Sequence, residues 1–489
     1  MKAPFWLVAS TAFALGGCDF APRYAPPHMS LPAKFKDAPR DGAELPANGA
    51  WWVSFRDRTL DELESQVDTA NPTLAAAVAA NDAAAQRALQ AAAGLLPQIN
   101  GIGQVTANRQ SNNRPLRGAN ELDYYGNNIL GAQVSYEIDI WGRVRDLVKA
   151  ANLTAEASVD ALADARLELH AELARAYVDL RGLDAQAKLI SSTIGIYSSA
   201  LDLTKSRLQA QIASPVDVDR AQTQLSAAQA QGSEIALQRA ALEDAIAALV
   251  GKPAASFSIA KTSGVLPLPK RPRAVPVEVL RRRPDVAEQE RLTAAANQDI
   301  GAARANFLPR FTLLALGGTQ DTGFRLFNPG NAFGTIGPSM DFPLFDAGLR
   351  QAELEVAKDV FTQAAEQYRA TVLNAIKEVE DNLTALRWLA EEARQTETAA
   401  AAAQRAADLS LTLYRDGASS YLDVVTAQST ALEDERLAII LRTRELESNI
   451  GLMLALGGGW TVPPPPPPPP TNFTPDPVQL VRDAAKGDP

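Results

Sequence analysis

Two hydrophobic periods run along this chain, and the first is an alternation of apolar and polar residues that predicts β-strands. It is clear in residues 97–109 and 128–140 and less regular in residues 308–319 and 332–343. Val134 and Tyr136, for example, fall on one face, with Glu137 on the other. Each segment has the length of a tilted transmembrane strand, about 9–11 residues. An ordinary half-buried hairpin of a soluble sheet would show the same alternation.

The second period places apolar residues three and four positions apart and predicts four very long helices. The expected helices cover residues 142–211, 215–250, 347–415 and 420–456. At about 1.5 Å per residue, the longest would reach roughly 100 Å. They are rich in alanine and carry polar residues on more than one face, which favours coiled-coil-like layers around something other than a solid core. A soluble coiled-coil rod is the alternative for this part.

The sequence also repeats itself once. LLPQI at residues 95–99 returns as FLPRF at residues 307–311, and SPVDV at residues 214–218 returns as SYLDV at residues 420–424. A glycine expected to end a helix follows each second motif at the same distance, Gly251 and Gly457. We therefore expect an internal duplication, in which each half contains a short helix, two strands and two long helices.

These patterns divide the chain into six parts. The expected parts are a signal peptide at 1–17, a lipidated arm at 18–59, a first repeat at 60–252, a linker at 253–275, a second repeat at 276–458 and a proline-rich tail at 459–489. The tail contains eight consecutive prolines at 463–470, which form a stiff polyproline II rod. A spacer, a recognition segment or a disordered terminus would each have this composition.

Four strands place a constraint on the assembly if they span a membrane. The smallest membrane barrels have about 8 strands, and an open sheet edge in lipid would leave backbone groups without hydrogen-bond partners. The chain would then have to oligomerise, and three copies would supply about 12 strands.

Composition removes most catalytic chemistry. The chain has 2 histidines and 1 cysteine among 489 residues. This composition argues against metal clusters, disulfides and histidine-based catalysis. Its net charge of -10 argues against a nucleic-acid partner, which requires clustered cations. We expect no enzyme, no metal and no cofactor. His28 and His170 are far apart in the sequence and are not expected to form a metal site.

The N-terminus indicates export and a lipid anchor. Lys2 precedes an apolar run at residues 5–15 that ends at the single cysteine, Cys18. This run is too short to span a membrane and is typical of a signal peptide, so Cys18 is the expected lipidation site. Asp19 resembles a signal that retains lipoproteins in the inner membrane.

Three motifs resemble those of a known family. They are WWVSFRD at residues 51–57, RRRPDV at residues 281–286 and AARANFLPRF at residues 302–311. The chain resembles the outer-membrane efflux factors of the TolC and OprM type, specifically the NodT-type lipoprotein branch, over nearly all of its mature length. A charge run before a helix is usually a solvated helix start, so we expect residues 281–285 to position a helix.

The resemblance implies a mixed α and β fold in a homotrimer. Four strands from each chain would form an outer-membrane β-barrel of about 12 strands, continued by a long periplasmic α-helical barrel with an equatorial domain. The implied function is an outer-membrane exit duct of a tripartite efflux system. It would passively conduct substrates from an inner-membrane pump, of the proton-driven RND type, through a periplasmic adaptor protein. The outer-membrane lipid is a further implied partner.

The resemblance also implies a gate at the periplasmic helix tips. In the family, a tyrosine-containing turn precedes a helix whose first exposed positions close the aperture. The matching positions here are Tyr414, Leu422 and Asp423, with Asp217 as the first-half counterpart, which could pair with Tyr414 or Arg415. Capping of the return helices is the alternative role of both aspartates.

Two further family positions depart from the pattern. A gating aspartate is replaced by Thr426 and a basic latch residue by Ser419. The transported substrate is not readable, although only Met29, Met340 and Met453 survive processing, which disfavours a methionine-based route for soft metals. The alternative function is a periplasmic scaffold or adaptor lipoprotein anchored in the inner membrane.

Overall fold

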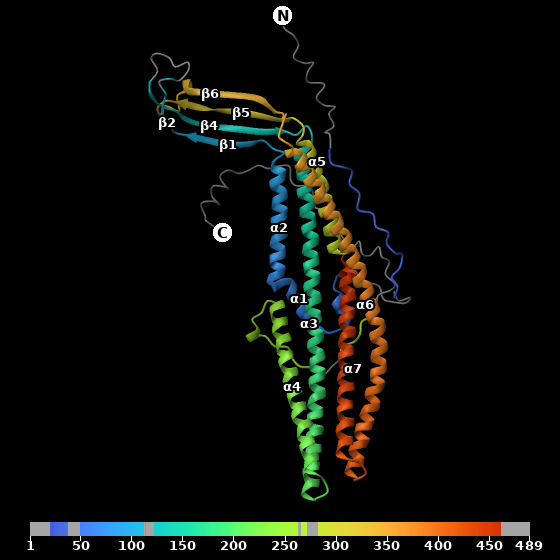
Figure 1. Cartoon of the computed structure of the whole chain (residues 1–489). Coiled ribbons are helices and arrows are strands. Elements are labelled where there is room, and N and C mark those ends of the chain that lie inside the picture. The colour runs from blue at the N-terminus through green and yellow to red at the C-terminus, as the bar shows by residue number, and fades with distance from the viewer. Residues whose placement is uncertain are drawn as a thin grey trace.

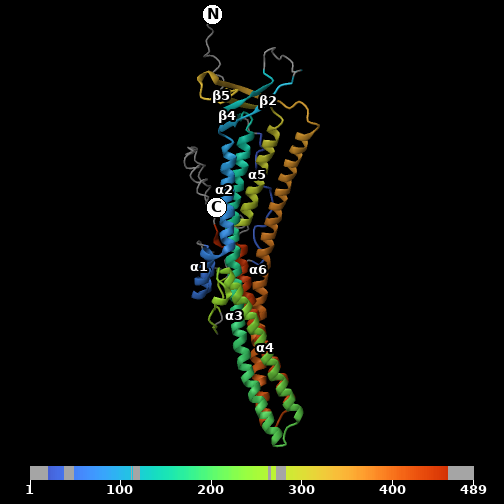
Figure 2. The same ribbon diagram turned by 90° about the vertical axis from the view of Figure 1, so that its left-hand side faces the viewer.

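The computed structural model is an elongated molecule with a β-sheet at one end and two helical hairpin tips at the other, in both of two perpendicular views (Figures 1 and 2). It describes residues 20–37, 49–111, 113, 122–262, 266–270 and 282–460. The expected signal peptide, Cys18, Asp19 and the polyproline segment 463–470 lie outside the described residues. The fold is mixed α and β and rich in helix.

The sheet has four antiparallel strands in the order β1-β4-β5-β6. Their bounds are Gln98–Gln104 for β1, Asn128–Ile138 for β4, Arg310–Asp321 for β5 and Ala332–Asp341 for β6. The expected single strand at 97–109 is instead two, because β2 (Ala107–Arg109) pairs with β3 (Tyr124–Gly126) in a separate sheet. The break lies at Thr106, whose carbonyl accepts from the Asn127 amide at 3.0 Å.

The strand register separates two chemically different faces, because directly paired residues share a face. One face is mainly polar, with Gln98, Asn100, Gln104, Gln133, Ser135, Glu137, Arg310, Thr312, Gln320, Thr335, Ser339 and Asp341. The other is mainly apolar, with Ile99, Leu130, Ala132, Val134, Tyr136, Ile138, Phe311, Leu313, Ala315, Ile336, Pro338 and Met340. Several large residues of the apolar face are exposed in this single chain, including Ile99 and Ile336.

Two helical hairpins extend away from the sheet. The first consists of α3 (Arg143–Gln209) and α4 (Pro215–Leu249), and the second of α6 (Leu349–Arg415) and α7 (Tyr421–Ala455). The long helices have 67 residues each and the return helices 35 each. Helices α2 (Pro72–Ala93) and α5 (Pro284–Ala305) lie beside the long helices nearer the sheet, and α1 (Arg58–Ala70) lies near mid-length (Figure 1). Short 3-10 helices cover Trp51–Phe55, Ala254–Ser256, Pro329–Asn331 and Gly457–Gly459.

Both long helices begin in the same way. Each follows a glycine in the left-handed region, Gly142 at φ +81° and Gly348 at φ +90°, where a side chain would be strained. An aspartate shortly before each glycine then accepts from helical amides. Asp139 accepts from Val144 at 3.2 Å, and Asp346 accepts from Arg350 at 3.1 Å. These aspartates satisfy amides that have no partner within the helix.

The main apolar core lies near mid-length. Trp51 and Phe55 are fully buried there against α1, α3 and α7, together with Tyr177. A second cluster forms around Phe35, which packs against residues of α5, α6 and α7. The first described part of the arm, residues 20–37, therefore lies along α5 and α6 (Figure 1).

The RRRPDV motif positions α5, but its third arginine is not solvated. Arg283 is only 8% exposed, so the expectation of a solvated charge run is wrong at this residue. Its guanidinium donates to both oxygens of Asp285 at 2.9 and 2.8 Å, to Glu378 of α6 at 2.7 Å and to the Ala455 carbonyl of α7 at 3.0 Å. A buried cation requires such partners, and these join three helices. Arg281 lies outside the described residues.

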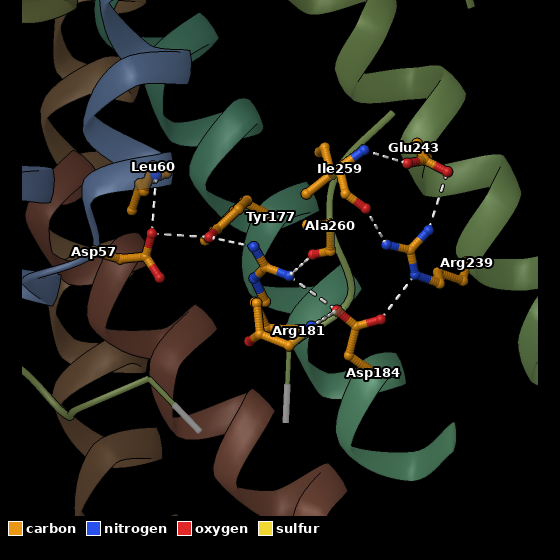
Figure 3. Close-up of polar contacts among 10 residues, drawn as sticks. Asp57, Leu60, Tyr177, Arg181, Asp184, Arg239, Glu243, Ile259 and Ala260 are labelled. Atoms are coloured by element: carbon orange, nitrogen blue, oxygen red, sulfur yellow. Dashed lines mark hydrogen bonds and ion pairs between the residues drawn. The ribbon is translucent and has the colours of Figure 1, made fainter. Parts of the chain in front are cut away.

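A second buried network fixes the linker after α4 to α3 and α4 (Figure 3). Asp184 accepts from Arg181 at 2.9 Å and from Arg239 of α4 at 2.7 Å. The two arginines also donate to the linker carbonyls of Ala260 at 2.8 Å and Ile259 at 2.7 Å. All three charged side chains are at least 94% buried. Arg239 also donates to Glu243 at 3.0 Å, whereas Asp184 is the carboxylate that the two arginines share.

The network continues to the start of α1. Arg181 donates to the Tyr177 hydroxyl at 2.7 Å, and Tyr177 donates to Asp57 at 2.9 Å. Asp57 also caps α1 by accepting from the amides of Thr59 and Leu60. The aspartate of WWVSFRD is thus a helix cap and a contact to α3 (Figure 3).

We expect Asp184→Ala to lower the free energy of unfolding by about 3 kcal/mol, because it leaves two buried guanidinium groups without their shared carboxylate. Asp219→Ala on the exposed surface of α4 is the matched control and should change it by less than about 0.5 kcal/mol. Denaturant unfolding followed by circular dichroism measures both. Equal effects of the two substitutions would contradict the central role of Asp184.

A carboxyl pair joins α3 to α7. Asp179 of α3 is hydrogen-bonded to Glu447 of α7, and both line a cavity of about 510 Å³ with Gln186, Gln238 and Arg444. Burial, reinforced by the hydrogen bond and negative charge of Glu447, raises the pKa of Asp179 to about 7. The pair therefore favours a proton on Asp179 at mildly acidic pH.

Because the folded-state pKa of Asp179 lies above its unfolded-state pKa of about 4, this group favours folding at low pH and loses that effect as pH rises through about 7. Asp179→Asn should match the unfolding free energy of the wild type at about pH 3, below both pKa values, and exceed it by about 1 kcal/mol at about pH 8. Asp202→Asn, an exposed change of the same charge on α3, is the control. A pH-independent difference for Asp179→Asn would exclude this titration.

Candidate functional site at the helix tips

The two hairpin turns share one backbone geometry. In each turn, the amide of one residue donates to the carbonyl five residues earlier, as in the Schellman motif that ends many helices. The pairs are Ile212 with Arg207 in the first turn and Ala418 with Leu413 in the second, both at 2.8 Å. The residue in the left-handed region is Gln211 at φ +58° in the first turn and Gly417 at φ +79° in the second. Gln211 has a side chain where this conformation favours glycine.

Both aspartates expected near the gate cap their return helices. Asp217 accepts from the Ser214 amide at 3.2 Å, and Asp423 accepts from the Ser420 amide at 3.0 Å and the Ser420 hydroxyl at 2.8 Å. The serine side chains accept in return from helical amides, which completes a capping box in each hairpin. The capping role considered for both aspartates is therefore present.

Asp217 makes neither of the expected contacts across the tips. Its second close contact in the described structure is Arg220, one turn along α4, at 3.8 Å. No hydrogen bond joins it to Tyr414 or Arg415 among the described residues. Within the chain, the carboxylate of Asp217 is held by the capping box with Ser214.

Tyr414 connects the two hairpins through a residue that the sequence analysis missed. Arg207, at the end of α3, donates to the carbonyls of Tyr414 at 2.8 Å and Arg415 at 3.1 Å. Its guanidinium carbon also lies 4.7 Å from the centre of the Tyr414 ring, a cation–π distance. A cation beside the last carbonyls of α6 is favourable for the helix dipole.

The sequence signal for Arg207 was present but incomplete. A basic residue in the last turn of a helix usually serves the carbonyls of its own helix. Arg207 instead serves those of a helix about 200 residues away, so only the packing of the hairpins reveals its partner.

Aromatic packing forms the rest of this contact. The rings of Tyr414 and Tyr421 meet edge to face at 5.2 Å, and both are buried with Tyr197 and Val424. Burial raises the pKa of Tyr414 and raises that of Tyr421 to about 12. The Tyr414 hydroxyl is buried without a hydrogen-bond partner among the described residues.

Leu422 and Asp423 point away from this core. Leu422 is 48% exposed and Asp423 is exposed, whereas Tyr421 and Val424 on either side of them are buried. Thr426 and Ser419, the two residues that depart from the family pattern, form hydrogen bonds with nearby backbone carbonyls. Thr426 donates to the Leu422 carbonyl at 3.0 Å, and Ser419 donates to the Ser410 carbonyl at 3.4 Å.

The structure offers no metal site within the residues that it describes, since none of their histidines, cysteines, aspartates and glutamates form a suitable group of three. His170 is buried between Glu64 at 2.6 Å and Asp68 at 3.1 Å and stacks on Trp52. Burial raises the pKa of Glu64 to about 7, although the contact with His170 acts in the opposite direction. This group therefore fastens α1 to α3.

None of the described helices combines the length and apolar character needed to cross a membrane.

Comparison with known proteins identifies the family. The family model described as "Outer membrane efflux protein" matches residues 63–252 and 275–458. The chain is 31% identical over 464 residues to the probable efflux pump outer membrane protein TtgC of Pseudomonas putida, covering 93% of this chain and 95% of the relative. It is 30% identical to the outer membrane protein OprJ of Pseudomonas aeruginosa, covering 94% of this chain and 97% of the relative.

A solved structure agrees with this assignment. The outer-membrane channel OprN has a TM-score of 0.84 and 26% identity, with 91% of this chain and 100% of that chain covered. The resemblance inferred from the motifs is confirmed. The chain therefore belongs to the outer membrane efflux protein family, and it is an outer-membrane efflux channel of a tripartite system.

Proposed function

We propose that three copies of this chain form a lipid-anchored duct through the outer membrane and into the periplasm. The duct conducts passively and catalyses no reaction. A proton-driven inner-membrane pump of the RND type delivers the substrates through a periplasmic adaptor, and the helix tips form the gate. The observation that carries this proposal is the four-stranded sheet, which has unpaired edges and opposite polar and apolar faces.

The sheet edges favour a trimer. Within the described chain, β1 pairs only with β4 and β6 only with β5, so each has one unpaired edge. These edges cannot face lipid unpaired. Pairing β6 of one copy with β1 of the next satisfies both edges, and three copies then close a barrel of about 12 strands.

The two faces then take distinct surroundings. The apolar face, with Ile99, Ile336 and Met340 more than half exposed, contacts lipid tails. The polar face, with Gln133, Thr335 and other hydrogen-bonding side chains, lines an aqueous lumen. Such alternation is typical of outer-membrane barrels.

The hairpins form the periplasmic α-barrel of this duct. Helices of 67 residues extend about 100 Å, and the equal lengths of the paired helices support an internal duplication with repeats at 60–252 and 276–458. The arm at 18–59 and the linker at 253–275 form the equatorial layer. The tail at 459–489 has no assigned role in this duct.

The lipid anchor is consistent with the described start of the arm. Arg304, near the end of α5, donates to the Phe20 carbonyl at 3.0 Å, six residues before the strand β5 begins at Arg310. The described arm thus begins beside the junction between α5 and the sheet, and the expected lipidation site, Cys18, precedes it in the sequence.

The gate in this proposal is a ring of Leu422 and Asp423 side chains from three copies. Their exposure beside a rigid aromatic cluster supports this role. Tyr414 joins the turn before Leu422 and Asp423 to α3 through its contact with Arg207. Asp217 stabilises the start of α4 as part of its capping box. The adaptor opens the tips by separating these hairpins.

Protein extracted in detergent from density-separated outer membranes should have three times the mass of one chain. Native mass spectrometry or light scattering measures this mass. Cys18→Ser is the companion variant, and it should lose the added lipid mass while the barrel still closes. A monomer, or recovery only with inner membranes, would contradict the closed barrel and favour a periplasmic scaffold.

Removal of the ring side chains should raise the leak conductance in planar bilayers. We expect Leu422→Ala and Asp423→Asn each to raise it about twofold or more, because they widen or discharge a constriction. Asp423 is the third residue of the capping box, and the side-chain oxygen of asparagine can accept from the Ser420 amide as the carboxylate does, so Asp423→Asn removes the charge and keeps this contact.

Two controls separate the gate from helix capping. Ser420→Ala weakens the cap but keeps the carboxylate, and Leu237→Ala truncates an exposed leucine of α4 far from the tip. Both should conduct like the wild type. A leak in Ser420→Ala equal to that in Asp423→Asn would assign Asp423 to capping alone.

A further inference from the structure

A group of charged side chains lies where the polar face of the sheet meets the helices. Arg310 and Asp341 are direct partners in the register of β5 and β6, and Glu137 shares their face on β4. These residues lie at the ends of their strands nearest the helices. They border a cavity of about 300 Å³ that Arg143, Arg350 and Glu353 also line.

The charges in this cavity are not equally neutralised. Arg143 donates to both oxygens of Glu137 at 2.9 and 2.7 Å, which is the geometry of a strong bidentate pair. Arg350 pairs with Asp346 at 3.2 Å. Arg143 and Arg350 are therefore compensated by close carboxylates.

Arg310 differs from the two other arginines. Its closest ion-pair distance in the described structure is 3.9 Å, to a Glu137 oxygen that already accepts from Arg143. Its side chain is 50% exposed. Asp341 is also exposed, and no ion pair at 4.0 Å or less joins it to Arg310 among the described residues. Both charges are therefore available to a solute in the cavity.

We propose that Arg310 and Asp341 form a charge-selective ring at the base of the barrel, where they contact charged groups of the passing solute. The inference rests on the proposed barrel, because it requires the polar face to line the lumen. Three copies would place alternating guanidinium and carboxylate groups around the pore at one level. Anionic groups of solutes, such as carboxylates and sulfonates, bind at Arg310, and ammonium groups bind at Asp341.

This ring is separate from the helix tips. Helix α6 begins eight residues after Asp341 and ends beside the tip turn, so about 100 Å separates the two levels. Electrostatic interactions are screened over about 10 Å at 0.1 M salt. The ring at the sheet therefore acts on ions independently of Asp423, and substitution of one level leaves the field at the other unchanged.

The test is the reversal potential of the channel in planar bilayers under a potassium chloride gradient. Arg310→Gln removes the cation and should raise the potassium-to-chloride permeability ratio about twofold, whereas Asp341→Asn should lower it about twofold. Measurement near 0.1 M salt keeps the screening length at about 10 Å, so the charges of the ring act on nearby ions. The opposite signs of the two shifts distinguish a charge effect from a general change in pore width.

Two controls complete the experiment. Arg310→Lys keeps the charge and should retain the wild-type ratio, and Arg58→Gln makes the same charge change on the exposed surface of α1, where the side chain is 92% exposed. Native mass spectrometry checks that each variant still assembles as a trimer. Unchanged ratios in assembled Arg310→Gln and Asp341→Asn would overturn the ring while leaving the channel intact. Absence of conductance in the wild type and also in the gate variant Leu422→Ala would overturn the proposed channel and the ring with it.

Discussion

Backbone groups at the two free edges of the sheet impose the constraint on which the rest of this molecule depends. Strands β1 and β6 each leave one row of amide and carbonyl groups unpaired within the chain. In water such an edge is tolerated, but in a hydrocarbon environment each unpaired group costs several kcal/mol. A membrane protein with this sheet must complete it with further strands, and identical copies are the most economical source.

The junction between the sheet and the helices has to satisfy a second requirement: the first backbone amides of each long helix need hydrogen-bond partners outside the helix. Asp139 and Asp346 bind the first amides of α3 and α6, and a glycine before each helix takes the left-handed conformation that redirects the chain. Charged residues are therefore concentrated at this level. Several are compensated locally, whereas Arg310 and Asp341 lack a close ion pair among the described residues and led to the proposed ring.

At mid-length, the molecule relies on buried ion pairs rather than on apolar packing alone. Asp184 and Arg283 each bind groups from several segments, so one side chain fixes several elements at once. Buried pairs contribute little net stability compared with apolar residues, but removing one partner is costly. In the proposed duct, whose helix tips would separate on opening, such pairs give the mid-length region a defined geometry. The family motifs WWVSFRD and RRRPDV contain residues of these contacts, which explains their structural rather than catalytic character.

The sequence by itself determined the features that depend on residues close together in the chain. Alternation indicated the strands of the main sheet, three-four spacing indicated the long helices, and the serine and aspartate pairs at 214 and 217 and at 420 and 423 already contained the capping boxes. The motifs were sufficient to identify the family. Local hydrogen bonds and side-chain periodicity follow directly from the order of residues, so a single sequence is enough to read them.

Only the tertiary structure decided which distant residues meet. Arg207 contacts the end of α6, Arg283 is buried among three helices, and Asp217 accepts from Ser214 in a capping box. The segment at 107–109 leaves the main sheet and pairs in a second one. Each outcome depends on the rotation and offset of packed elements. Those quantities are set by many side chains together, and a shift of one residue in strand register or one turn of a helix exchanges the partners. The period of a sequence identifies which face of an element is buried, but the neighbour against which it is buried is a property of the assembled fold.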